Sequence, residues 1–218
     1  MCFSATASFT TAGVTGVIGV IALARMSRSR EFMLAAMPIA FAIQQSIEGL
    51  LWLNLPLAPD DPVATRLTLL FLLLAEVWWP LYVPAMMLLV EPDERRRRLM
   101  LPWLVTGLGV AAYLLWGILM RPHGARILSG HVVYVTEHQF PFAVGLAYLA
   151  ATCLPLLLST HRAVVILGVI VLTGCVTAYA FYWESFVSVW CFFGASASAV
   201  ILFHFEQARR HRFRMANV

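Results

Sequence analysis

The chain has 218 residues, of which 61% are hydrophobic and 12% are charged, and it carries a formal net charge of +4. Soluble domains carry about 25% charged residues, so this composition excludes an ordinary soluble domain and indicates a membrane protein. All 15 basic residues are arginine. A retinal pigment needs a lysine amine for its Schiff base, so retinal is excluded as a cofactor.

Seven apolar segments are long enough to cross a bilayer, which takes about 20 residues per helix. They run, in chain order, over residues 6–25, 33–55, 67–90, 101–120, 140–158, 163–183 and 186–205. The first has no basic residue before its apolar core, so it is interpreted as a retained span and not as a signal peptide. Because the connections are short, the sequence predicts one domain over residues 1–218: an all-α, polytopic transmembrane seven-helix bundle.

The arginines predict the orientation of this bundle. They follow alternate spans, as Arg25, Arg28 and Arg30, then Arg95 to Arg98, then Arg162, and finally Arg209, Arg210, Arg212 and Arg214. Positive residues are enriched on the cytoplasmic side of membrane proteins. The N-terminus is therefore expected outside and the C-terminus in the cytoplasm. The arginines are also expected to contact anionic lipids of the bilayer, whereas nucleic acid is not expected as a partner.

Two carboxylates, Glu48 and Glu76, lie inside apolar spans. An ionised carboxylate in hydrocarbon costs roughly 3 kcal/mol on insertion scales, so such residues usually mark a buried site or pathway. A helical rise of 1.5 Å per residue puts Glu48 about 10 Å and Glu76 about 15 Å below the outer surface. Gln44, Gln45 and Trp52 share a helix face with Glu48. The sequence thus predicts a polar site in the outer half of the bundle.

Two features are expected to shape this site. Pro80 and Pro84 follow Glu76 in the third span, and a proline can bend a helix and open space beside it. The longest outer loop, residues 121–139, has two apolar stretches around Ser129-Gly130, a pattern typical of a hairpin. We expect this loop to cap the outer face of the bundle.

Further polar residues are expected at the same outer end, and they indicate the kind of site. A metal ion would be held by Cys2, Glu48, Glu76, His138 and Glu184, because thiol, imidazole and carboxylate together suit zinc, copper or iron. A small ligand would be bound by Gln44, Gln45, Glu48, Glu76, Tyr182 and Glu184. No local spacing such as HExxH accompanies these residues. The sequence therefore assigns no catalytic residue and leaves open whether the protein is an enzyme.

Two other functions remain open at this point. Glu48 and Glu76 could serve a transporter or a proton or ion conduit, or they could hold helices together in a structural subunit with no catalytic site. The polar stripe fades below Glu76, which favours a cavity closed at its base. The buried thiols Cys153, Cys175 and Cys191 are interpreted as packing residues. No histidine pair is expected at matched depth on facing spans, which argues against a bis-histidine haem.

The segments MCFSATASF and QQSIEGLLW, the latter with Gln44, Gln45, Glu48, Gly49 and Trp52, carry a resemblance. The chain resembles, over its whole length, an uncharacterised family of bacterial multi-pass membrane proteins that begin with MCFSA. The resemblance implies a protein of the bacterial inner membrane and no particular reaction. It also implies that Cys2 and Glu48 belong to the shared pattern of the family.

Overall fold

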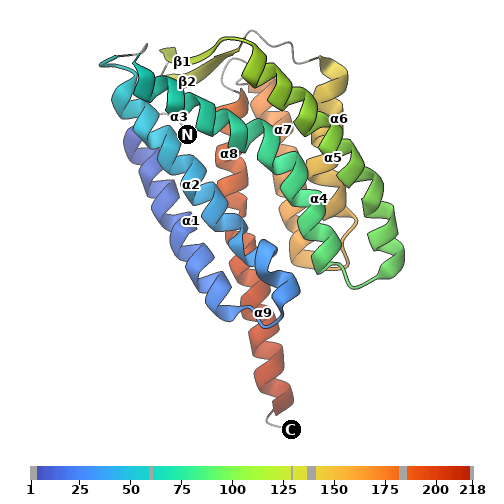
Figure 1. Ribbon diagram of the computed structural model, residues 1–218. Coiled ribbons are helices and arrows are strands. Elements are labelled where there is room, and N and C mark those ends of the chain that lie inside the picture. Colours follow the sequence, from blue (N-terminus) through green and yellow to red (C-terminus); the bar gives the residue numbers. More distant parts are fainter. Residues whose placement is uncertain (1–3, 59–60, 129, 137–140, 182–185, 217–218) are drawn as a thin grey trace.

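The computed structural model describes residues 4–58, 61–128, 130–136, 141–181 and 186–216 as a mostly helical bundle (Figure 1). Its elements, in chain order, are α1 (Ala5–Arg25), the short 3-10 helix η1 (Ser29–Glu31), α2 (Phe32–Asn54), α3 (Pro62–Leu72), the π-helix η2 (Leu73–Trp78), α4 (Trp79–Val90), α5 (Glu94–Met120), β1 (His123–Leu128), β2 (His131–Thr136), α6 (Phe142–Leu157), α7 (Arg162–Phe181), α8 (Phe186–Ala197) and α9 (Ala199–Ala216).

Six helical stretches of the described chain are long and apolar enough to cross a membrane. They are α1, η1 with α2, the run from α3 through α4, α5, α7, and residues Val189–Gln207 of α8 and α9. This makes a multi-pass membrane protein. The count is one below the predicted seven, because α6 has 16 residues where the sequence predicted a span over 140–158. Sixteen residues reach about 24 Å, short of a hydrocarbon core of about 30 Å.

Two helices begin earlier than their apolar segments, because each is capped by an aspartate. The Asp61 carboxylate accepts from the Val63 amide of α3 at 3.2 Å, and Asp93 accepts from the Arg96 amide of α5 at 2.8 Å. Such side chains satisfy amides that have no partner within the helix. The helices therefore extend beyond the apolar segments predicted over 67–90 and 101–120, and Arg95 to Arg98 lie in the first turns of α5.

The small residues of α1 pack against α2. A Cβ atom at Gly19 would lie 2.6 Å from the Ile39 side chain, and one at Gly16 would lie 3.7 Å from Ala42. Small residues allow helices in lipid to approach closely. A Cβ atom at Gly13 would meet no described neighbour within 4 Å. The close approach of α1 to α2 is therefore at Gly16 and Gly19.

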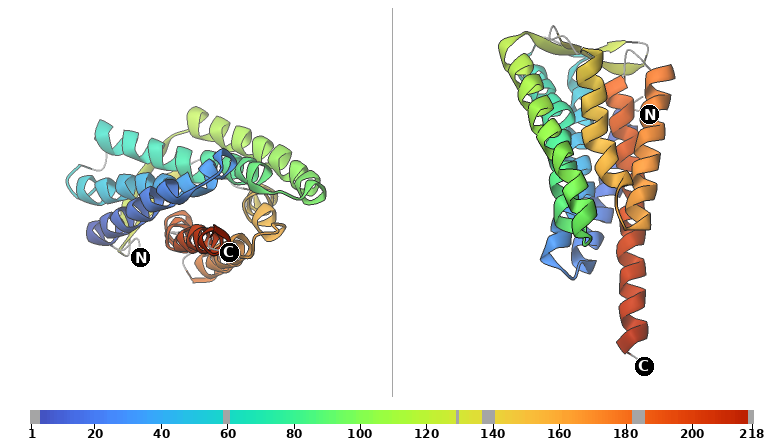
Figure 2. Two further views of the ribbon diagram at one scale, coloured as in Figure 1. Left: turned by 90° about the horizontal axis from the view of Figure 1, so that it is seen from below. Right: turned by 90° about the vertical axis from the view of Figure 1, so that its right-hand side faces the viewer.

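The predicted hairpin is confirmed and covers one end of the bundle, which we call the hairpin end (Figure 2). Strands β1 and β2 pair antiparallel from His123 opposite Thr136 to Leu128 opposite His131. Gly130 has a φ of 75°, a turn conformation that glycine adopts without strain. The Tyr134 ring of β2 stacks on Phe71 of α3 with ring centroids 4.4 Å apart. This stacking holds the hairpin against the bundle.

The opposite end of the bundle is held by a buried carboxylate that the sequence analysis missed. Glu91 is 1% exposed at the end of α4. It accepts hydrogen bonds from the Thr160 amide at 2.9 Å, the Ser159 hydroxyl at 3.2 Å and the Asp93 amide at 3.2 Å. Glu91 thereby ties the α4–α5 connection to the α6–α7 connection. Helix α9 continues past this end of the bundle (Figures 1 and 2).

Gly107 is predicted to be essential for the packing of α5. A Cβ atom there would overlap the Pro80 carbonyl oxygen, whereas one at Gly109 would meet nothing within 4 Å. We expect Gly107→Ala to destabilise the protein by about 1–3 kcal/mol through overpacking. The matched control Gly109→Ala should be neutral or stabilising, since alanine favours a helix over glycine. Thermal melting of the purified variants in detergent measures both, and equal melting temperatures would contradict this packing.

Candidate functional site

Buried polar side chains from five elements gather in the half of the bundle nearer the hairpin. This polar cluster consists of Gln44, Gln45 and Glu48 of α2, Glu76 of η2, Trp79 of α4, Tyr148 of α6 and Cys191 of α8. Each is at most 7% exposed. Glu48 lies close to the hairpin end of α2, and Cys191 packs in one apolar group with Ala125 and Val132 of the hairpin. The predicted polar stripe of α2 therefore faces protein and not lipid.

Hydrogen bonds fix how the α2 side chains are oriented. The Trp79 indole nitrogen donates to Gln44 Oε1 at 2.8 Å, and Gln45 Nε2 donates to Glu48 Oε2 at 3.3 Å. An indole N–H can only donate, so the Gln44 amide is held with its oxygen towards Trp79, while the Gln45 amide is oriented by its bond to Glu48. Gln45 Oε1 is buried and has no hydrogen-bond partner among the described residues. An acceptor is thus left available beside Glu48.

Glu76 lies within the π-helix η2, and Pro80 explains why the helix is irregular there. In a π-helix a carbonyl accepts from the amide five residues later. For Ala75 that residue is Pro80, which has no N–H. The Tyr148 hydroxyl of α6 donates to the Ala75 carbonyl instead. The predicted distortion near Pro80 therefore lies at Glu76 itself, and such π segments are frequent at functional sites.

Cys191 lies within electrostatic range of both carboxylates. Its thiol interacts with the Gln44 side chain and lies in the electrostatic field of both Glu48 and Glu76. Glu48 and Glu76 are both buried, and each acts electrostatically on this one thiol. The three described cysteines are buried and free of disulfides, but Cys191 does more than fill space because it contacts the cluster.

A small cavity adjoins the polar cluster on the side away from the hairpin. Its volume is about 40 Å³, enough for a few water molecules. Two aromatic pairs border it: Phe41 stacks on Trp79 with centroids 4.1 Å apart, and Tyr148 meets Trp190 edge-on at 5.3 Å. Cys191, Trp79 and Tyr148 belong to both the cavity wall and the polar cluster. The wall is mostly apolar, and the glutamines and carboxylates of the cluster do not line it.

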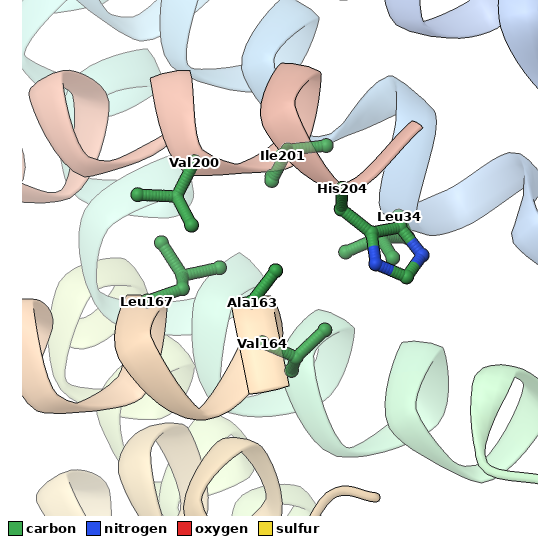
Figure 3. A pocket seen from close by; sticks show the side chains of 7 residues that line it. All are labelled: Leu34, Ala163, Val164, Leu167, Val200, Ile201 and His204. Carbon is green, nitrogen blue, oxygen red and sulfur yellow. The ribbon is translucent and has the colours of Figure 1, made fainter. Parts of the chain in front are cut away.

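Beyond this cavity the interior is filled with apolar side chains. Met86, Met87 and Leu167 are fully buried there. Figure 3 shows a second hollow nearer the far end, where His204 lies beside Leu34 and Ile201, and this hollow leaves no room for a water molecule. The packing closes the base of the site, in line with the fading polar stripe of the sequence.

Two histidines that the sequence analysis did not pair lie in contact. The rings of His161 and His204 pack edge-to-face with centroids 5.2 Å apart. The sequence analysis missed this pair because His161 lies in the short connection before α7. The pair is far from the polar cluster, at the opposite end of the bundle. Within the described ranges, no three His, Cys, Asp or Glu side chains are grouped so that they could hold a metal ion.

Several predicted site residues fall outside the described ranges. Cys2, His138, Tyr182 and Glu184 are among them. Of the predicted metal set, the structure therefore places Glu48 and Glu76. Of the predicted ligand set, it places these two with Gln44 and Gln45. Tyr148 and Cys191 also belong to the cluster, although sequence reasoning did not assign them to the site. The sequence feature that could have indicated them is a polar side chain at a similar depth in each span.

Comparison with curated proteins and with solved structures finds no match for this chain. A family model described as a family of unknown function, DUF6629, matches residues 1–217. The match spans nearly the whole chain, including all the residues of the polar cluster. The chain therefore belongs to this uncharacterised family, DUF6629.

Proposed function

We propose that this protein is a seven-span protein of the bacterial inner membrane and binds a small ligand or metal ion in its polar cluster. The start of α1 lies towards the hairpin end, and α9 ends beyond the opposite end (Figure 1). With α6 counted as a short seventh span, this arrangement supports an external N-terminus and a cytoplasmic C-terminus. The arginines of α5 and α9 would then lie in the cytoplasm. The polar cluster would face outwards.

The observation that carries the proposal is the buried Gln45 carbonyl beside Glu48. Gln45 and Glu48 are 0% exposed, and Gln45 Oε1 has no hydrogen-bond partner among the described residues. Leaving a buried acceptor unsatisfied costs about 1–3 kcal/mol, so such a group calls for an explanation. A ligand that donates a hydrogen bond to Gln45 and Glu48 together supplies it.

The closed base favours a binding site over a transport pathway. A conduit needs polar groups that continue to the far side of the membrane. Beyond the cavity, the described interior is packed with residues such as Met86, Met87 and Leu167. A metal ion in the site would need further ligands from the predicted set, namely Cys2, His138 and Glu184. No reaction is proposed, because no nucleophile and base are paired in the cluster as described.

The orientation predicts opposite behaviour of two reporters fused after Val218. A fluorescent protein that matures only in the cytoplasm should be bright, and a phosphatase that folds only outside the cytoplasm should be inactive. The control is the same pair of reporters inserted at Gly130, in the hairpin turn, where the phosphatase alone should work. An active phosphatase after Val218 would reverse the orientation and place the polar cluster on the cytoplasmic side.

Glu48→Gln is predicted to leave the melting temperature of the ligand-free protein unchanged or raised. Glutamine keeps an oxygen that can accept from Gln45 Nε2, and the substitution removes a charge that is costly to bury. Residues kept for binding often reduce stability. Thermal melting in detergent, with no added ligand, measures the effect.

Glu91→Gln is the matched control for this experiment, since Glu91 is also buried but accepts three hydrogen bonds. It should lose about 1–3 kcal/mol, because charge-assisted bonds are weakened. If Glu48→Gln is destabilised as strongly as Glu91→Gln, the cluster holds helices together and the proposed binding site is wrong.

A further inference from the structure

We infer that the contact between His161 and His204 is a pH-sensitive switch, which holds α9 against the α6–α7 connection as long as the two rings carry at most one proton. The contact lies at the end of the bundle opposite the hairpin, which the proposed orientation places in the cytoplasm. It does not depend on ligand binding in the polar cluster. It follows from the packing of the two rings, from the charges around them and from the way in which the two elements are anchored.

The two rings touch where there is no room for solvent between helices. Their centroids are 5.2 Å apart and the rings meet edge-on. His204 is half-buried and borders the small hollow of Figure 3, which leaves no room for a water molecule. Two imidazolium ions at this separation repel each other more strongly than they would in bulk water, because a partly buried place screens charge poorly. A second proton on the pair is therefore opposed.

The elements around the pair carry charged side chains near it, namely Arg25 of α1, Arg28, Arg30 and Glu31 at η1, Glu91 at the end of α4, Arg96 of α5, Arg162 of α7, and Glu206 and Arg209 of α9. Of these, Glu31 acts electrostatically on His204, and its negative charge favours one imidazolium. Glu206 is paired with Arg25 at 2.7 Å, and Glu91 accepts hydrogen bonds from the α6–α7 connection. One proton on the pair is thus accommodated, and a second is not.

The α6–α7 connection is anchored more firmly than α9, so α9 is the element that repulsion displaces. Two hydrogen bonds to Glu91 and two from Arg96 hold the connection. Helix α9 is joined to α1 by the ion pair of Arg25 and Glu206, whose side chains are 29% and 30% exposed. Ion pairs this exposed contribute little to stability.

A helix break at Ser198 allows α9 to move without α8, since α8 ends and α9 begins on either side of this residue. The Ser198 amide donates to the carbonyls of both Gly194 and Ala195, so the last turn of α8 is closed without α9. Helix α8 carries Cys191 of the polar cluster. Protonation of both histidines is therefore expected to loosen α9 from the connection and to leave α8 and the polar cluster in place.

The direction of the pH dependence follows from the number of protons that each form binds. The loosened form binds two protons and the packed form binds one, so a fall in pH favours the loosened form. Histidine ordinarily changes its charge at about pH 6.5. A difference of one bound proton shifts the equilibrium by up to about tenfold for each pH unit below that value.

Hydrogen exchange of the full chain in lipid nanodiscs tests this inference, at about pH 7.5 and about pH 5.5, one unit on either side of the ordinary histidine value. A metal chelator is present throughout. Protection factors, in which the intrinsic pH dependence of exchange is divided out, report local opening. From the higher to the lower pH, protection of residues 201–207 of α9 should fall about five- to tenfold. Protection of α8 should not change.

His204→Phe keeps an aromatic ring against His161 but cannot take up a proton, so its α9 protection should be the same at both pH values. His161→Phe removes the other charge and should behave in the same way. His123→Phe in the hairpin is the matched control, and it should lose α9 protection at the lower pH as the wild type does. Equal wild-type protection at both pH values would overturn the inference. So would a loss at the lower pH that persists in both variants of the pair.

Discussion

The geometry of the polar cluster depends on a single backbone carbonyl, that of Ala75. Within a bilayer every backbone polar group must be satisfied by the protein, since lipid offers no partner. Pro80 has no N–H for the Ala75 carbonyl of the π-helix η2, and the Tyr148 hydroxyl of α6 supplies the missing bond. This bond ties α6 to the irregular turn that carries Glu76. Gly107 has no side chain, so α5 can pack closely against the backbone at Pro80.

The irregular turn places Glu76 opposite the regular face of α2, and the two elements contribute unlike properties. Helix α2 supplies an ordered row of side chains. Gln44 is oriented by its hydrogen bond from Trp79 of α4, and Gln45 by its hydrogen bond to Glu48. Cys191 of α8 lies within electrostatic range of Glu48 and Glu76. The aromatic cavity below and the packed apolar base limit the depth to which a ligand can reach. Together these elements leave a buried acceptor, Gln45 Oε1, beside the Glu48 carboxylate.

Part of this structure could be predicted from the sequence, and the limits have physical causes. Long apolar segments and the glycine-containing turn at Gly130 gave the candidate spans and the hairpin. The helix starts at Pro62 and Glu94 were missed because they depend on capping by Asp61 and Asp93, not on hydropathy. Tyr148 and Cys191 were not assigned to the site because helices that are apolar all round do not reveal which side faces the bundle. The pairing of His161 with His204 was missed because His161 lies in the connection before α7 and in no span.

The central claim is that Gln45 Oε1, beside Glu48, is placed to accept a hydrogen bond from a bound ligand. A high-resolution structure of the full protein in lipid nanodiscs, beside the same structure of Glu48→Gln, tests it most directly. The account predicts non-protein density within hydrogen-bonding distance of both Gln45 Oε1 and the Glu48 carboxylate, and its loss in Glu48→Gln. A Gln45 carbonyl bonded to a protein side chain, with no such density in either structure, would contradict it.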